Sequence, residues 1–158
     1  MPTIISPDET GFIKGRYIGE NVRTLHEIID YFNNLNEKSL IFFSDFTKAF
    51  DILDHNFMKK CLLKFKFPNY MINWVDLLYK DGKSCIHNNG HLFSFFKIEK
   101  GVRQGCHLSP YLFIIWIELP PNEIRLNIDI KGINIGNIEI KQTLFADDAC
   151  FMTDGEKK

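Results

Sequence analysis

The sequence predicts an α+β fold in which helices pack on one face of an antiparallel sheet. Short apolar runs of strand-forming residues alternate along the chain with longer segments whose apolar residues recur at helical spacing. Two pairs of these short runs flank tight-turn residues, Asn88 to Gly90 and Gly136 to Asn137, which is typical of antiparallel hairpins. The 158 residues are 45% hydrophobic, which suffices for one globular domain with a sizeable core.

The first half of the chain is expected to contain one strand and three helices. After an irregular lead-in, apolar residues at helical spacing predict an amphipathic helix from about Glu20 to Leu35. The run from Leu40 to Phe46 is almost continuously apolar, as in a buried strand, and we expect that strand to begin near Ser39. The next helix is marked by Met58, Leu62 and Phe65. The third begins at Pro68, with a buried side formed by Met71, Val75 and Leu78.

The second half is expected to contain two hairpins, one helix and a final pair of strands. The first hairpin spans residues 84–98, and the second pairs Ile133 to Ile135 with Ile138 to Ile140. Between them, a helix is predicted from about Ser109 to Glu118, because Ser109 can cap it and Pro110 suits its first position. Pro120 and Pro121 should stop or kink this helix.

Composition limits the function classes. The formal net charge of -1 gives no overall attraction to nucleic acid, so local Lys and Arg clusters would have to hold any polyanion. No signal peptide is visible, and the longest strongly apolar run, Tyr111 to Ile117, is far shorter than the ~20 residues that span a bilayer. Cys85, His87 and His91 lack a fourth ligand and paired spacing, so zinc is not favoured. We expect an intracellular chain without a membrane partner.

Three aspartates stand out because they interrupt or end apolar segments. Asp147 and Asp148 are bracketed by strand-forming residues, which favours a tight hairpin with the pair at its tip. Asp45 ends the run that begins at Leu40. Burying an unpaired carboxylate is costly, and a hard cation such as Mg²⁺ would remove that cost. Turn chemistry alone also explains an Asp pair at the tip of a hairpin. Carboxylates on neighbouring strands would suit metal-assisted phosphoryl transfer.

A glycine-rich loop near the start of the chain carries two cations. Between Thr10 and Gly19, Lys14 and Arg16 could meet phosphates, since glycine allows close backbone approach. An ordinary surface loop explains the same residues, because the spacing is not that of a nucleotide-binding loop.

Four segments follow one another along the chain: Gly11 to Arg16, Phe43 to Asp51, Gly101 to Pro110, and Phe145 to Asp148. Together, in this order, they resemble the reverse transcriptase of non-LTR (LINE-type) retrotransposons. The resemblance covers nearly the whole chain. It implies the palm of a right-hand polymerase (about residues 39–155) with part of the fingers (about 1–38), in one domain fragment whose thumb and endonuclease would lie outside this chain.

The resemblance also implies an RNA-directed DNA polymerase that adds deoxynucleotides to a primer 3'-hydroxyl on an RNA template. Asp45, Asp147 and Asp148 would be the catalytic residues and would hold two Mg²⁺ ions, for which Mn²⁺ could substitute. The backbone carbonyl of Phe46 would be a further ligand. The partners implied are the RNA template, a DNA primer and deoxynucleoside triphosphates, in the nucleus or cytoplasm.

The remaining site residues are assigned by the same motifs. Phe50 would lie under the sugar of the incoming nucleotide and exclude its 2'-hydroxyl, although a core aromatic role explains Phe50 as well. Gln104 and Gly105 would contact the nucleotide. Nucleic acid would be bound by Lys14, Arg16 and Arg103. The alternative function is a catalytically silent palm remnant that at most binds nucleic acid or a protein.

Overall fold

The computed structural model describes residues 4–36 and 38–154. The chain forms two compact units, one made of the described residues up to Thr47 and from Ile117 onwards, the other running from Lys48 to Trp116. Across the described ranges, we find no helix that combines the length and the apolar character needed to cross a bilayer. The assignment of residues 1–38 to the fingers and 39–155 to the palm stays a prediction.

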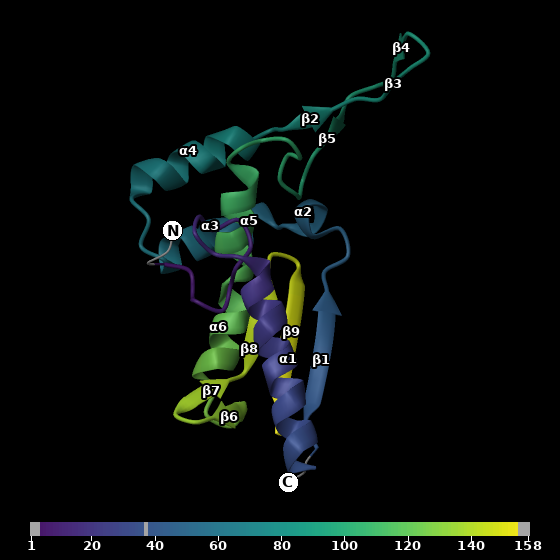
Figure 1. Ribbon diagram of the computed structural model, residues 1–158. Coiled ribbons are helices and arrows are strands. Elements are labelled where there is room, and N and C mark those ends of the chain that lie inside the picture. Colours follow the sequence, from purple (N-terminus) through teal and green to yellow (C-terminus); the bar gives the residue numbers. More distant parts are fainter. Residues whose placement is uncertain (1–3, 37, 155–158) are drawn as a thin grey trace. The chain divides into compact units, whose positions relative to one another are not determined.

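The first unit is built on a three-stranded antiparallel sheet (Figure 1). Its strands, in the spatial order β1-β9-β8, are β1 (Leu40–Asp45), β9 (Asp148–Thr153) and β8 (Gln142–Phe145). β8 and β9 form a hairpin, and β9 also pairs with β1 along the full length of both strands. The sequence therefore brings a strand from the first third of the chain against the hairpin at its end, and the expected antiparallel sheet is confirmed.

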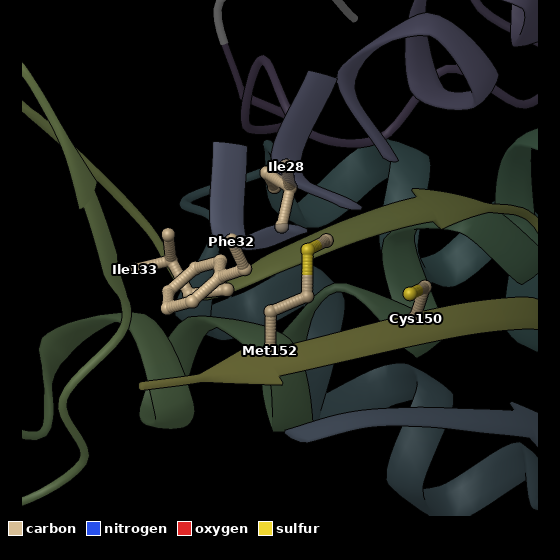
Figure 2. Close-up of a cluster of buried hydrophobic side chains, with 5 residues drawn as sticks. All are labelled: Ile28, Phe32, Ile133, Cys150 and Met152. Atoms are coloured by element: carbon tan, nitrogen blue, oxygen red, sulfur yellow. The ribbon is translucent and has the colours of Figure 1, made fainter. Parts of the chain in front are cut away.

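Helix α1 (Ile18–Leu35) lies along one face of this sheet (Figure 1). Ile28 and Phe32 of α1 pack with Cys150 and Met152 of β9 and with Ile133 in a buried cluster (Figure 2). These residues are four apart on the helix and two apart on the strand, so each element presents one face to the cluster. The predicted amphipathic helix is confirmed, and it begins slightly earlier than expected.

The prediction that β1 is a buried strand is wrong. Leu40, Phe42 and Phe43 are 62%, 64% and 66% exposed. The reason is the position of β1 in the sheet, where it pairs with β9 on one side and is the outer strand on the other. Phe42 stacks on Phe151 of β9 with ring centroids 6.3 Å apart, which is the cross-strand contact its position allows.

Two prolines lie in the first turn of a helix that is not expected from the sequence. Helix α5 (Ser109–Ile117) stops where expected, and α6 (Leu119–Leu126) follows at once with Pro120 and Pro121 in its first turn. Proline is tolerated there because the first N–H groups of a helix have no acceptor within the helix. The hairpin of β6 (Ile133–Ile135) and β7 (Ile138–Ile140) then forms in the expected register.

The second unit contains short helices and a long β-ribbon (Figure 1). Its helices before α5 are α2 (Ala49–Ile52), α3 (His55–Lys64) and α4 (Asn69–Tyr79). The ribbon pairs β2 (Lys83–Ser84) with β5 (Phe96–Lys97) and β3 (His87–Asn88) with β4 (His91–Leu92). Asn89 and Gly90 both have positive φ at its tip, which confirms the predicted turn.

The buried face of α4 differs from the prediction. Ile72 and Val75 are buried, while Met71 and Leu78 are 36% and 49% exposed. α4 packs against α3, and this contact selects the side of the helix that carries Ile72 rather than the neighbouring side that carries Met71. Pro68 is the residue before the helix and not part of its first turn.

Candidate active site

The ends of β1 and β9 bring two of the three predicted catalytic aspartates together. Asp45 is the last residue of β1 and Asp148 the first of β9, and the two are direct partners in the antiparallel register. Directly paired residues project from the same face of a sheet. The backbone N–H of Phe46 donates to the carbonyl oxygen of Asp147 at 3.3 Å, which extends the connection into the turn.

Asp147 lies in a two-residue turn between β8 and β9. Phe145 pairs with Asp148, so only Ala146 and Asp147 remain outside the ladder. The expectation that Asp147 and Asp148 share the tip is therefore only half right, because strand pairing takes Asp148 into β9. Ala146 has φ of 57° and is buried, a conformation that favours glycine and occurs at the first position of tight hairpin turns.

A buried carboxyl group holds this turn from the segment before α1. Oε1 of Glu9 accepts hydrogen bonds from the backbone N–H of Ala146 at 3.0 Å and of Gly11 at 2.5 Å. Glu9 is fully buried, and burial raises the pKa of its carboxyl group from 4.5 to about 7. Glu9 is not predicted from the sequence, because it lies in a segment without periodicity and no pattern marks its contact with a turn at the other end of the chain.

A cavity of about 300 Å³ opens beside the aspartates within the first unit. Asp45 and Asp148 line it together with apolar residues of α1 and the sheet, among them Ile18, Val22, Leu25, Phe43 and Phe145. The two carboxylates thus border a largely apolar space. On their other side both residues remain exposed.

The donor chemistry of the three aspartates fits a hard divalent cation. Asp45 and Asp148 are exposed and Asp147 is half-buried. Within residues 4–36 and 38–154, no Lys or Arg forms an ion pair with any of the three. In the same ranges, no three His, Cys, Asp or Glu side chains are already gathered as a metal site. Asp147 therefore has to join the pair formed by Asp45 and Asp148 if all three are to share an ion.

Phe50 lies in the second unit and packs on its core. Its ring stacks on Phe113 with centroids 4.9 Å apart and an interplanar angle of 17°. Its carbonyl oxygen accepts from the N–H of Val102 at 2.7 Å. Gly101 sits so close to this backbone that an added Cβ would lie 3.0 Å from the carbonyl oxygen of Phe50. These contacts support the core packing role that the sequence left open for Phe50. The residue is half-buried, so part of its surface remains exposed.

Gln104 and Gly105 form an exposed turn before α5. Gly105 has φ of 81°, and a Cβ added there would meet no atom within 4 Å. Glycine is thus required by the backbone conformation rather than by a close protein neighbour. Arg103 is exposed and donates to the carbonyl oxygen of Leu78 at 3.3 Å, and Ser109 Oγ donates to the carbonyl oxygen of Arg103 at 2.7 Å.

The two cations of the glycine-rich loop have different surroundings. Lys14 is exposed. The guanidinium group of Arg16 donates to the carbonyl oxygens of Ile5 at 3.0 Å, Glu9 at 2.5 Å and Ser6. These bonds tie the loop to the segment before it, and they compete with the nucleic-acid contact expected for Arg16.

Comparison with known proteins decides the family. The model of the family described as "Reverse transcriptase (RNA-dependent DNA polymerase)" matches residues 1–158. The chain belongs to the reverse transcriptase family. It is 31% identical over 151 residues to the transposon TX1 uncharacterized 149 kDa protein of Xenopus laevis. It is 26% identical over 142 residues to the retrovirus-related Pol polyprotein from type-2 retrotransposable element R2DM of Drosophila melanogaster.

The resemblance of this reverse transcriptase domain to those of non-LTR retrotransposons is thereby confirmed. The two matches cover 94% and 90% of the chain but only 11% and 13% of the relatives, so the chain spans about a tenth of their length. Among solved structures, apo telomerase from Candida tropicalis, truncated from its C-terminal domain, matches with a TM-score of 0.64 at 14% identity. That match covers 93% of this chain and 30% of the telomerase chain, and it confirms the right-hand polymerase fold.

Proposed function

We propose that this domain copies RNA into DNA, adding deoxynucleotides to the 3'-hydroxyl of a primer by two-metal phosphoryl transfer. The observation that supports this most directly is the register that places Asp45 opposite Asp148 beside the turn of Asp147. Two exposed carboxylates face each other there with the half-buried Asp147 next to them, and among the described residues no Lys or Arg forms an ion pair with any of the three. Such a site favours a divalent cation over a structural ion pair.

Asp45, Asp147 and Asp148 would hold two Mg²⁺ ions, with the backbone carbonyl of Phe46 as a further ligand. Bound there, the ions would favour deprotonation of the primer hydroxyl and neutralise charge on the triphosphate. The chain itself supplies the carboxylates at the ends of paired strands, where the ladder restricts their movement.

The other motif residues are assigned to substrate binding. Phe50 would exclude a 2'-hydroxyl from the incoming nucleotide, and Gln104 and Gly105 would contact that nucleotide. The open space around Gly105 leaves its backbone accessible to a ligand. Arg103 and Lys14, both exposed, would contact the phosphates of the RNA template or the DNA primer. Arg16 would reach a phosphate only by giving up backbone contacts.

Primer extension tests this proposal. The purified chain is incubated with an RNA template, a DNA primer, Mg²⁺ and deoxynucleotides, beside Asp147→Asn and the control Asp30→Asn, which changes an exposed carboxylate on α1. Extension that persists in the control and is lost in Asp147→Asn supports the proposal. The chain spans about a tenth of the length of its relatives, and metal binding is a test that does not depend on the rest of their length. Mn²⁺ binding is therefore measured on the same proteins by electron paramagnetic resonance. Equal Mn²⁺ binding by wild type and Asp147→Asn would favour the silent remnant.

A further inference from the structure

The segment before α1 is held against β8 by its backbone. The N–H of Leu144 donates to the carbonyl oxygen of Asp8 at 2.8 Å, and the N–H of Thr10 donates to the carbonyl oxygen of Leu144 at 2.9 Å. These two bonds make a parallel bridge between Glu9 and Leu144. Glu9 therefore lies beside the strand that leads into the turn of Asp147, and the residues on either side of it are hydrogen-bonded to that strand.

Side chains strengthen this attachment. Nδ2 of Asn21 donates to the carbonyl oxygen of Leu144 and to Oγ1 of Thr10, both at 2.8 Å. Arg16 donates to the carbonyl oxygen of Glu9 at 2.5 Å. The segment that carries Glu9 is thus bonded to α1, to the glycine-rich loop and to β8, all within the first unit.

The Glu9 carboxyl group faces the turn. Oε1 accepts from the N–H of Ala146 and from the N–H of Gly11. Ala146 is the residue directly before Asp147 and has the positive φ that the turn requires. A hydrogen bond to its N–H holds the peptide that sets this conformation. Since alanine pays a conformational cost at positive φ, the turn depends on such bonds more than a glycine turn would.

Gly11 allows this arrangement. A Cβ at Gly11 would lie 2.6 Å from the backbone nitrogen of Ala146 and 2.9 Å from Oε1 of Glu9. Both distances are shorter than a carbon atom can make without displacing its neighbours. The backbone of Gly11, the Glu9 carboxyl group and the Ala146 peptide therefore form one packed contact that no larger residue at position 11 could preserve.

We propose that Glu9 is a positioning residue that holds the backbone of the Ala146–Asp147 turn beside the Asp45–Asp148 pair, from where the Asp147 side chain can join the other two around a divalent cation. This role rests on the proposed function. Oε1 carries both hydrogen bonds, while Oε2 is buried and has no hydrogen-bond partner among the residues that the structure describes. The turn is therefore held by the hydrogen-bond acceptor Oε1. This acceptor is present whether the carboxyl group is protonated or ionised. Glutamine would supply the same acceptor.

The test measures Mn²⁺ affinity of the full chain by electron paramagnetic resonance. We expect Glu9→Ala and Glu9→Asp to weaken Mn²⁺ binding about tenfold, because groups that orient metal ligands affect affinity on that scale. Aspartate keeps the carboxyl group but withdraws the acceptor by one methylene group. The Mn²⁺ affinity of Glu9→Gln should stay within about twofold of wild type, since glutamine keeps the acceptor at its full length.

The control is Glu118→Asp. Glu118 is also a buried carboxyl group of the first unit, but it bonds to Arg125 at 3.2 Å and to the N–H of Ser6 at 3.2 Å rather than to the turn. Shortening it should leave Mn²⁺ affinity unchanged. If Glu9→Ala does not fold, Glu9→Asp compared with Glu118→Asp still decides, and amide hydrogen exchange at Ala146 should be faster in Glu9→Asp alone.

The outcomes separate this assignment from the proposed function. If Asp147→Asn weakens Mn²⁺ binding but Glu9→Asp binds as wild type does, the positioning role is overturned and the metal site stands. Unchanged protection of the Ala146 amide in Glu9→Asp would overturn it as well. If Asp147→Asn itself binds Mn²⁺ as wild type does, the proposed metal site is wrong and the role of Glu9 toward it falls too.

Discussion

Asp45 and Asp148 are direct cross-strand partners at the end of the β1–β9 ladder, so two carboxylates project from one face of the sheet at adjacent positions. Like charges in directly opposed positions destabilise an antiparallel pair, and the described residues provide no basic side chain to offset this. The arrangement is therefore unfavourable for stability and favourable for cation binding.

Asp148→Asn should reveal both effects. In metal-free buffer we expect it to raise the free energy of unfolding by about 0.2 to 1 kcal/mol, because one of the two opposed charges is gone. With Mn²⁺ present, the wild type should gain stability with increasing concentration and the variant should gain less. Urea unfolding with and without Mn²⁺ measures this, with Asp30→Asn as control. A variant that is less stable than wild type without metal would contradict the repulsion argument.

The stability of the first unit should also depend on pH through Glu9. Its pKa is raised to about 7 in the folded chain, mainly by burial, so between pH 4.5 and 7 the folded state keeps a proton that the unfolded state releases. Stability contributed by Glu9 is therefore greatest at low pH and falls as pH rises through this window, by about 3 kcal/mol in total.

Glu9→Gln isolates this contribution because it stays neutral at every pH. We expect the variant and the wild type to unfold at similar urea concentrations at pH 5, and the variant to be the more stable one at pH 8. Burial also raises the pKa of Glu118, which adds a dependence of the same sign to both proteins. A difference that stays constant from pH 5 to pH 8 would show that Glu9 is not buried as described.

Gly11→Ala should destabilise the chain through a steric clash. The added methyl group would lie 2.6 Å from the nitrogen of Ala146, so the turn or the segment of Glu9 must shift, at a cost of about 1 to 3 kcal/mol. Gly82→Ala is the matched control, because the nearest atom to its Cβ would lie at an ordinary 3.6 Å. Thermal unfolding of both variants checks this, and equal effects would argue against a specific clash at Gly11.

Local patterns predicted the elements that depend on local chemistry. The apolar residues around Asp147 and the turn residues Asn89 and Gly90 predicted hairpins correctly, since turn conformation and strand pairing there involve neighbours in sequence. The first turn of α6 was missed because two prolines suggest an end, although they equally suit a beginning.

Features that depend on distant contacts could not be predicted in this way. The apolar run of β1 predicts a buried strand, but the burial of a strand depends on its neighbours in the sheet. β1 is an edge strand, and its side chains are largely exposed. The contact of Glu9 could not be predicted for the same reason, since its partner Ala146 is far away in the sequence. The roles of Asp45, Asp147 and Asp148 in catalysis stay predictions that the metal-binding measurements address.

Phe50→Ala should relax discrimination against ribonucleotides. If the ring excludes the 2'-hydroxyl, its removal should raise ribonucleotide incorporation relative to deoxynucleotide incorporation about tenfold or more, as expected when a steric barrier in a binding pocket is lost. Primer extension with each nucleotide class measures the ratio. The ring also stacks on Phe113, so the variant should lose stability as well, by about 0.5 to 1.5 kcal/mol from the aromatic pair alone.

Phe113→Leu separates selection from packing. It removes the same ring stack from the other side and leaves the Phe50 ring in the chain, so stability should fall while the ratio of ribonucleotide to deoxynucleotide incorporation stays near that of wild type. If both variants change the ratio equally, the discrimination depends on the packing of this region rather than on the Phe50 ring. If Phe50→Ala leaves the ratio unchanged, Phe50 is a core aromatic, and nucleotide selection must be sought elsewhere in the chain.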